Sequence, residues 1–438
     1  MWRSQLHFSI WICIIILQIS SEEGTILLQS IKAQGSTAGN LRSSMISSSF
    51  NFINSIIGSG IIGLPYALNQ AGLPFGLLLL IVVGFITDYT IILLIKGGNL
   101  SGTNSYQALV QSTFGFPGFL ILSVLQFLYP FIAMISYNIT TGDTLTKVFL
   151  RIPGVGPSHI LANRHFVILV ITVLFTLPLS LYRNIERLGK VSVMEQYIGF
   201  TRYLLTPIKT SFSNVNLMHI LFITAFICHH NSFLIYGSLQ NPTLSRWTIV
   251  THVSVGSALV ISAVFAVAGY ATFTGYTQGD IFENYCRDDN LATFGRFCFG
   301  LSIITTFPLE CFVTREVLSN VMCYRELSRV KHGAITFLIV AVCTAISVSL
   351  DCLALVMELN GALSAIPLMF ILPSACYLKL SPGRWFHSHN LGPCVLIGLG
   401  LFFMITGLTL TGVFQQDCSH GVEMFYCTDT NVSSTLAP

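Results

Sequence analysis

The chain has 438 residues, of which 53% are hydrophobic and only 9% are charged, with a formal net charge of +3. Ordinary soluble domains carry about 25% charged residues, which they need to cover their surface. The composition therefore excludes a soluble enzyme and a soluble nucleic-acid-binding protein. High apolar content with a small net charge also excludes a disordered chain. We expect a single all-α, polytopic membrane domain.

Residues 1–45 precede the first long apolar segment and form a separate amino-terminal part. Their apolar run, residues 6–19, is shorter than the roughly 20 residues that a spanning helix needs. The run resembles the hydrophobic part of a signal peptide, although no clear small-residue cleavage site follows it. The amino-terminal part is therefore either cytosolic, with a peripheral anchor, or signal-like.

Long stretches without Asp, Glu, Lys or Arg, such as residues 43–87 and 97–142, predict membrane-spanning helices. Because lipid offers the backbone no hydrogen bonds, these stretches must be helices rather than open strands. Residues 46–414 then form the transmembrane domain, and residues 415–438 form a tail on the outer side. The expected spans are residues 46–71, 73–95, 118–139, 165–182, 217–236, 251–274, 294–314, 333–350, 353–378 and 391–414.

Residues 191–210 are a weak eleventh span, because they carry three charged side chains. With eleven spans and an inner amino terminus, thirteen Lys and Arg residues fall on the inner side and five on the outer side, as the positive-inside rule requires. With ten spans, the basic segments 183–190 and 315–331 fall on opposite sides. Either residues 191–210 cross the membrane poorly, or the chain lacks a proper fifth helix.

The predicted outer side carries candidate sites for two covalent modifications. Asn431 begins an Asn-Val-Ser sequence, which is an acceptor for N-glycosylation. Cys286 lies in an outer loop and Cys418 and Cys427 lie in the tail, where an oxidising compartment permits a disulfide. Cys418 and Cys427 are neighbours on the tail and are our candidate pair, although the sequence leaves the pairing among the three cysteines open.

The first span is interrupted in its middle by three glycines and a proline, within NSIIGSGIIGLP from Asn54 to Pro65. Glycine favours bends and proline removes a backbone donor, so we expect an unwound segment. Such a segment exposes N–H groups at one half-helix end and carbonyl groups at the other, which suit an anion and a cation respectively. Close helix packing through small residues is the alternative.

The sixth span, counting residues 191–210 as the fifth, places Cys228, His229, His230, Asn231 and Ser232 in succession. Polar side chains in mid-membrane avoid lipid, so this run indicates a second opened helix. Its two histidines are candidates for proton binding, and hydrogen bonding to neighbouring carbonyls is the alternative. Interrupted first and sixth spans are typical of transporters built from a five-plus-five inverted repeat with a midplane site.

The eighth span supplies hydroxyl groups and a carboxylate in the sequence SIITTFPLE. The adjacent hydroxyls of Thr305 and Thr306, which follow Ser302 in this sequence, can complete an oxygen cage for a small hard cation. Ordinary hydrogen bonding of these threonines to their own helix is the alternative. Glu310 is a third candidate for proton-linked chemistry, and a pair with Arg315 is its structural alternative.

Four motifs in this order resemble the sodium-coupled neutral amino acid transporter family of the amino acid and auxin permease group. They are GSGIIGLP (58–65), LPLSLYRNIERLGKVS (177–192), AFICHHNSFLIY (225–236) and LNGALSAIPLMFILPSACYLKL (359–380). The resemblance covers residues 50–427 and implies a leucine-transporter-like fold of about eleven helices. It also implies an inner amino terminus, an outer carboxy terminus, sodium symport and small neutral amino acid substrates.

The resemblance also implies which residues bind. The implied sodium-binding residues are Asn54, Ser302, Thr305 and Thr306. The backbone of one segment would hold the substrate carboxylate, and carbonyls of another would face its amine: Ser59, Gly60 and Ile61 in the first, with Phe226 and Cys228 in the second. The chain departs from the family in its first 45 residues and at residues 194–216, which replace an apolar fifth helix. We expect the second departure to impair coupling.

We therefore expect a secondary transporter that carries a small neutral amino acid by sodium symport and alternating access. Its partners would be the amino acid, sodium and the lipid bilayer, with no nucleic acid and no cofactor, since Na+ is only co-transported. No nucleophile motif, phosphate loop or metal spacing suggests an enzyme, and we assign no catalytic residue. Alternatives are proton coupling through His229, His230 or Glu310, and a sensor or scaffold that binds an amino acid without transport. We expect the plasma membrane ahead of the lysosomal membrane.

Overall fold

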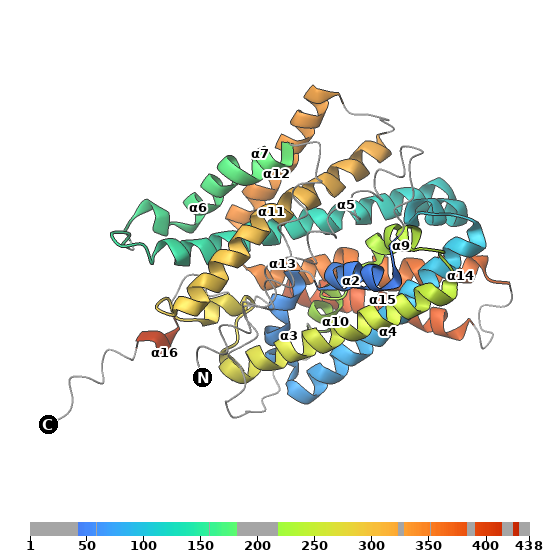
Figure 1. The fold of residues 1–438 in the computed structure, drawn as a ribbon, viewed down its shortest axis with the longest axis horizontal. Coiled ribbons are helices and arrows are strands. Elements are labelled where there is room, and N and C mark those ends of the chain that lie inside the picture. Colours follow the sequence, from blue (N-terminus) through green and yellow to red (C-terminus); the bar gives the residue numbers. More distant parts are fainter. Residues whose placement is uncertain are drawn as a thin grey trace.

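The computed structural model describes residues 43–57, 59–156, 158–181, 218–322, 328–350, 352–382, 390–413 and 424–428 (Figure 1). Within these ranges the chain is helical, and its β contact is an isolated bridge between Ser43 and Leu239. The apolar run at 6–19, the weak span at 191–210 and the glycosylation candidate Asn431 lie outside the described residues.

Eight helices in the described ranges are long and apolar enough to cross a membrane. Two of them are composite, because short π-helical segments continue the α-helix. The bounds are α4 (Leu73–Ser101), α5 (Tyr106–Phe149), α6 (Arg164–Ile171) continued by η3 (Thr172–Thr176) and α7 (Leu177–Leu181), α10 (Leu244–Phe273), α11 (Asn290–Val321), α12 (Arg329–Ser349), α13 (Leu353–Asn360) continued by η8 (Gly361–Ala365), η9 (Pro367–Ile371) and α14 (Leu372–Leu380), and α15 (Leu391–Val413).

The other two predicted spans are also helical but broken. The first comprises α2 (Met45–Ile56), the 3-10 helix η1 (Ser59–Gly63) and α3 (Leu64–Ala71), and the sixth comprises α8 (Met218–Thr224) and α9 (His229–Ser238). The ten expected spans therefore all coincide with helices, and the all-α polytopic fold is confirmed. Short helices outside the spans are η2 (Ile160–Ala162), η6 (Thr274–Tyr276), η7 (Ile281–Asn284) and α16 (Phe425–Thr428).

The helices form two groups that meet along the broken spans (Figure 1). In one group, α5 packs against α11, α12 and α6, and α7 packs against α11 and α12. In the other, α10 packs against α2, α3 and α4, and α14 packs against α4 and α15. The composite span that begins with α13 contacts both groups, since α13 packs against α5 and α15.

Two glycines with positive φ set the directions of consecutive helices. Gly72 (φ 76°) separates α3 from α4, and a proline follows at the start of α4. Gly115 (φ 69°, ψ −159°) bends the beginning of α5 away from its long remainder. Glycine adopts this backbone region without the steric cost that a side chain brings, so the chain turns sharply there.

A disulfide ties the end of the chain to the loop before α11. Cys286 bonds to Cys427, with their Cα atoms 5.4 Å apart. The pair that we favoured, Cys418 with Cys427, is wrong, because Cys427 is taken by Cys286 and Cys418 lies outside the described residues. The folded loop brings Cys286 to the tail from 141 residues away in sequence, which spacing alone does not reveal.

Candidate transport site

The first helix opens where the glycines and the proline interrupt it. The last turn of α2 is closed by a hydrogen bond from the Ile57 N–H to the carbonyl of Ile53, and the chain then changes to the tighter η1. Pro65 stands in the first turn of α3, where its missing N–H costs no helical hydrogen bond. The predicted interruption of the first helix is confirmed.

The sixth helix opens between Thr224 and His229. Cys228 has φ −143° and ψ 6°, which is outside the helical region, and α9 begins directly after it. The ends of the two halves make local turns, with the Phe226 N–H donating to Ile223 and the Asn231 N–H donating to Cys228. The predicted second opening is confirmed as well.

The two openings lie against each other. A Cβ atom built on Gly60 would come within 2.8 Å of the Cα of Ala225, so the backbones touch at a point where only glycine fits. On one side of this contact α2 packs against α9, and on the other α3 packs against α8. The Asn231 amide also donates to the Ser55 hydroxyl over 2.8 Å. Four half-helix ends therefore converge on one place in the interior.

The two histidines at the start of α9 have different neighbours. His229 is fully buried and shares a 2.9 Å hydrogen bond between its Nε2 and the hydroxyl of Thr90 on α4. The ring of His230 lies 5.3 Å from the ring of Tyr129 on α5, in a tilted arrangement. The histidines thus connect the opened helix to both helix groups, one on each side.

On α11 the hydroxyls of Thr305 and Thr306 both donate to the Ser302 carbonyl, over 2.8 and 2.9 Å. These are the within-helix bonds that we gave as the alternative to a cation cage. Glu310 lies one turn further along the same helix and interacts electrostatically with Tyr129. Arg315 instead donates to the Ser180 carbonyl and to the Thr336 hydroxyl.

The remaining candidate residues belong to the two opened segments and their flanking turns. Ile61, Phe226 and Cys228 are buried beside the openings. The side chains of Asn54 and Ser59 lie outside what the structure describes, although their backbones belong to α2 and η1. Ser55, Thr90 and Tyr129 also contact the site but were not predicted, because single hydroxyls on long helices carry no pattern of their own.

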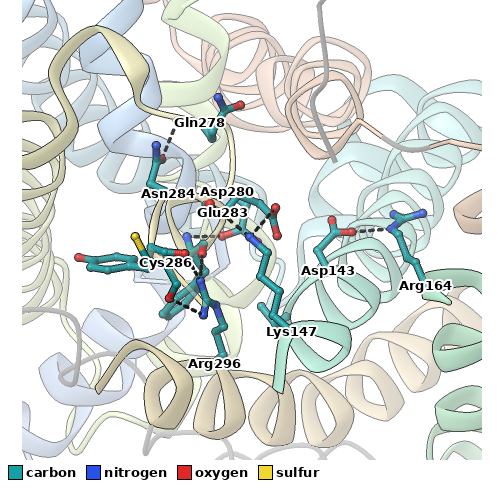
Figure 2. Close-up of polar contacts among 12 residues, drawn as sticks. Asp143, Lys147, Arg164, Gln278, Asp280, Glu283, Asn284, Cys286 and Arg296 are labelled. Atoms are coloured by element: carbon teal, nitrogen blue, oxygen red, sulfur yellow. Dashed lines mark hydrogen bonds and ion pairs between the residues drawn. The ribbon is translucent and has the colours of Figure 1, made fainter. Parts of the chain in front are cut away.

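Figure 2 shows a second buried polar region, which we call the outer cluster because its loop lies on the side predicted to be outer. Lys147 of α5 forms a 2.8 Å ion pair with Glu283 of η7, and Asp143 of α5 pairs with Arg164 of α6. Arg296 of α11 donates to backbone carbonyls of the loop before it. Asp280, from the same loop, is the sixth member. The outer cluster therefore comprises Asp143, Lys147, Arg164, Asp280, Glu283 and Arg296.

Within the outer cluster, two ion pairs join Lys147 to Glu283 and Arg164 to Asp143, while Arg296 bonds to backbone carbonyls. Among the residues that the structure describes, no group of three His, Cys, Asp or Glu side chains is placed to hold a metal ion. The charge pattern of the sequence placed Lys147, Arg164 and Arg296 on the outer side but not in contact with acidic partners. The cluster's bonds from Lys147 and Arg296 anchor the loop before α11 to α5 and α11.

The fold and the two facing helix openings define a membrane transporter. The sequence family described as "Transmembrane amino acid transporter protein" matches residues 41–411, and the chain belongs to this family. Like its relatives, which are named as transporters, it is a transporter and not an enzyme.

Two of the similar proteins come from vertebrates and one from yeast. "Putative sodium-coupled neutral amino acid transporter 11" from Danio rerio is 64% identical over 413 residues, covering 90% of this chain and 92% of that protein. The Homo sapiens protein of the same name is 52% identical, with 84% and 95% covered. "Vacuolar amino acid transporter 2" of Saccharomyces cerevisiae is 31% identical, with 87% and 85% covered. The resemblance found in the four motifs is confirmed.

Among solved structures, a manganese transporter from Eremococcus coleocola superposes with a TM-score of 0.51 at 14% sequence identity. The match covers 95% of this chain and 91% of that one. At this identity the likeness concerns the fold alone, which is the leucine-transporter-like fold.

Proposed function

We propose that the protein carries a small neutral amino acid across the membrane by sodium symport. The observation that carries this proposal is the contact between two opened helices in the interior, at Gly60 and Ala225. The vertebrate relatives, which are named sodium-coupled neutral amino acid transporters, support the ion and the substrate class.

A zwitterionic substrate matches the polarity of the half-helix ends. The substrate carboxylate would bind N–H groups around Ser59, Gly60 and Ile61, where a helix begins and its dipole is positive. The amine would face carbonyl groups near Phe226 and Cys228, at the end of the preceding half-helix. The side chains of Ile61 and Phe226 beside these groups are buried and apolar, which favours a neutral substrate side chain over a charged one.

Sodium would bind at Asn54, Ser302, Thr305 and Thr306. The hydrogen bonds from both threonines to the Ser302 carbonyl do not conflict with this role. A hydroxyl that donates its hydrogen keeps two lone pairs, so these bonds orient both oxygens and leave them able to bind a hard cation. Transport would follow when one helix group moves against the other around the site.

Radiolabelled uptake into proteoliposomes tests the proposal directly. A panel of neutral, acidic and basic amino acids is offered while the sodium and proton gradients are varied separately. We expect saturable uptake of neutral amino acids that requires an inward sodium gradient. Uptake that ignores sodium would overturn the coupling, and saturable binding without flux would favour a sensor.

Thr306→Ala tests the proposed sodium site, with Thr409→Ala as the matched control. Both threonines donate to a carbonyl four residues earlier in their own helix, but Thr409 is exposed on α15. We expect Thr306→Ala to raise the sodium concentration for half-maximal uptake about tenfold, which is the loss of about 1.4 kcal/mol of binding free energy. Asn54→Ala should act in the same way. Unchanged sodium dependence in either variant would remove that residue from the site.

Proton coupling is a second candidate, favoured by the contact of His230 with Tyr129 and by Glu310 near the same tyrosine. These groups connect the opened sixth helix to the opposite helix group, where a bound proton would alter the contact between them. Uptake that follows the pH gradient without sodium, and that His230→Gln or Glu310→Gln uncouples, would select this candidate.

We also propose the plasma membrane as the location of the protein. Surface biotinylation of a tagged chain, compared with lysosomal fractionation, tests this. Recovery of the chain mainly in the lysosomal fraction would overturn the plasma-membrane location.

A further inference from the structure

The loop between η6 and α11, residues 277–289, is unusually buried for a connection between two helices. Thr277, Asp280, Ile281 and Glu283 are each exposed by less than a tenth, and Asn284 is fully buried. Loops normally run over the surface, because their polar groups need water. This loop instead satisfies its polar groups internally, since the Asn284 amide bonds to Gln278 and Tyr276 (Figure 2).

The loop packs into the helix bundle next to the first opening. A Cβ atom on Gly63 of η1 would lie 3.8 Å from the Gly279 carbonyl, and one on Gly279 would lie 3.0 Å from Ala354 of α13. The Ile281 side chain reaches Gly269 of α10. The loop therefore covers the end of η1 on the predicted outer side of the transport site.

Asp280 stands in the middle of this loop with one oxygen satisfied and one not. Its Oδ1 accepts a hydrogen bond from the Phe282 N–H over 2.9 Å. Its Oδ2 is buried and has no hydrogen-bond partner among the described residues. An ionised carboxylate is costly in such a place unless a cation pairs with it.

Lys147 and Arg296 lie near Asp280 and partly offset the cost of its charge, but neither gives its Oδ2 a hydrogen bond. Lys147 of α5 is bonded to both the carboxylate and the carbonyl of Glu283. Arg296 of α11 is directed to the carbonyls of Phe282 and Tyr285. Asp143 of α5 is paired with Arg164.

Within the loop, Glu283 adds a like charge near Asp280. Gly63, Gly269 and Ala354, which contact the loop from η1, α10 and α13, are uncharged.

We propose that Asp280 is a proton-binding site, and that a proton bound there favours the conformation in which loop 277–289 is packed into the bundle and closes the outer side of the transporter. The site is separate from the transport site and is independent of which ion drives uptake. It would make the outer closure respond to the pH of the outer compartment.

The direction follows from linkage. Burial, with Glu283 nearby, raises the pKa of Asp280 from its ordinary value of 3.8 to about 7 in the packed loop. When the loop lifts, the carboxyl meets water and its pKa returns towards the ordinary value. The packed state therefore binds the proton more tightly than the lifted state. Lowering the pH from about 7 towards 3.8 shifts the population towards the packed state.

Thiol labelling of the full chain in lipid nanodiscs measures this population. Ile281→Cys places a thiol under the loop at a position that is 3% exposed, and Asp288→Cys provides an exposed reference in the same loop. The ratio of their maleimide labelling rates corrects for the effect of pH on thiol reactivity. The unsubstituted chain gives the background from the native thiols.

We expect the ratio to fall roughly tenfold from pH 7.5 to pH 5.5, because labelling of Cys at position 281 requires the lifted loop. Asp280→Asn keeps the acceptor for the Phe282 N–H and mimics the protonated acid, so its ratio should be low at both pH values. Asp288→Asn removes an exposed carboxylate from the same loop and should leave the dependence intact. A pH-independent ratio in the Ile281→Cys chain overturns the proposal by itself, and so does an unchanged dependence in Asp280→Asn.

Discussion

The helix openings and the outer cluster are both buried and polar, yet they handle polarity in opposite ways. At the openings the polar groups are backbone ends and neutral side chains, such as the Asn231 amide bonded to Ser55. In the outer cluster they are full charges, matched in short ion pairs such as Lys147 with Glu283. Both regions lie on the same helices, since α5 and α11 contribute to each.

The difference follows from what each region must do. A full countercharge in a site binds an ion more tightly and slows its release. Partial charges of half-helix ends attract an ion without that cost. The outer cluster holds a loop in place, and a paired charge is suited to that because breaking the pair leaves an uncompensated buried charge. The openings are thus adapted for exchange and the cluster for anchoring.

The largest effect on stability should come from breaking the anchor. Lys147→Met leaves the Glu283 carboxylate buried without its cation, which we expect to cost about 3–5 kcal/mol of unfolding free energy. Asp288→Asn is the matched control, because its ion pair with Arg151 is exposed and is worth about 0–1 kcal/mol. Thermal unfolding in detergent measures both. Equal losses in the two variants would contradict the assignment of Lys147 and Glu283 as an anchor.

Transport should respond most strongly to a substitution that forces the two openings apart at their contact. Gly60→Ala puts a Cβ atom within 2.8 Å of the Ala225 backbone, so one of the two segments must move. We expect uptake to fall about a hundredfold, equivalent to about 2.7 kcal/mol, while the protein still reaches the membrane. Gly256→Ala on α10 is the control, because nothing lies within 4 Å of its added Cβ. Normal uptake by Gly60→Ala would show that the contact is not essential.

The sequence predicted the helices and both openings for a physical reason. A long stretch without charged residues predicts a spanning helix, and Gly60 or Pro65 indicates where that helix is interrupted. Each of these signals is local in the sequence. The pairing of Lys147 with Glu283 joins residues 136 positions apart and depends on how α5 and the loop before α11 are placed. No local pattern encodes that distance, and the wrong choice of Cys418 as a disulfide partner has the same cause.

The stability of the outer cluster should depend on pH through Asp280. Because the pKa of Asp280 is raised to about 7, the folded chain binds this proton more tightly than the unfolded chain. Its contribution therefore grows as pH falls through 7 and should reach roughly 2 kcal/mol at pH 5.5. Unfolding measurements at pH 7.5 and 5.5 should show this gain in the native chain and lose it in Asp280→Asn. An equal gain in both chains would assign the dependence to other groups.

The smallest effect that still separates the regions concerns the neutral bond across the openings. Asn231→Ala removes the hydrogen bond to Ser55 without leaving a charge behind, so we expect a loss of about 1 kcal/mol in stability. A double-mutant cycle with Ser55→Ala should give a coupling energy of the same size, because the two side chains bond to each other. The corresponding cycle of Lys147→Met with Glu283→Gln should give a larger coupling, since each single change leaves a buried charge that the double change removes. Similar coupling energies in the two cycles would mean that the openings are held as firmly as the anchor, and that the movement needed for transport arises elsewhere.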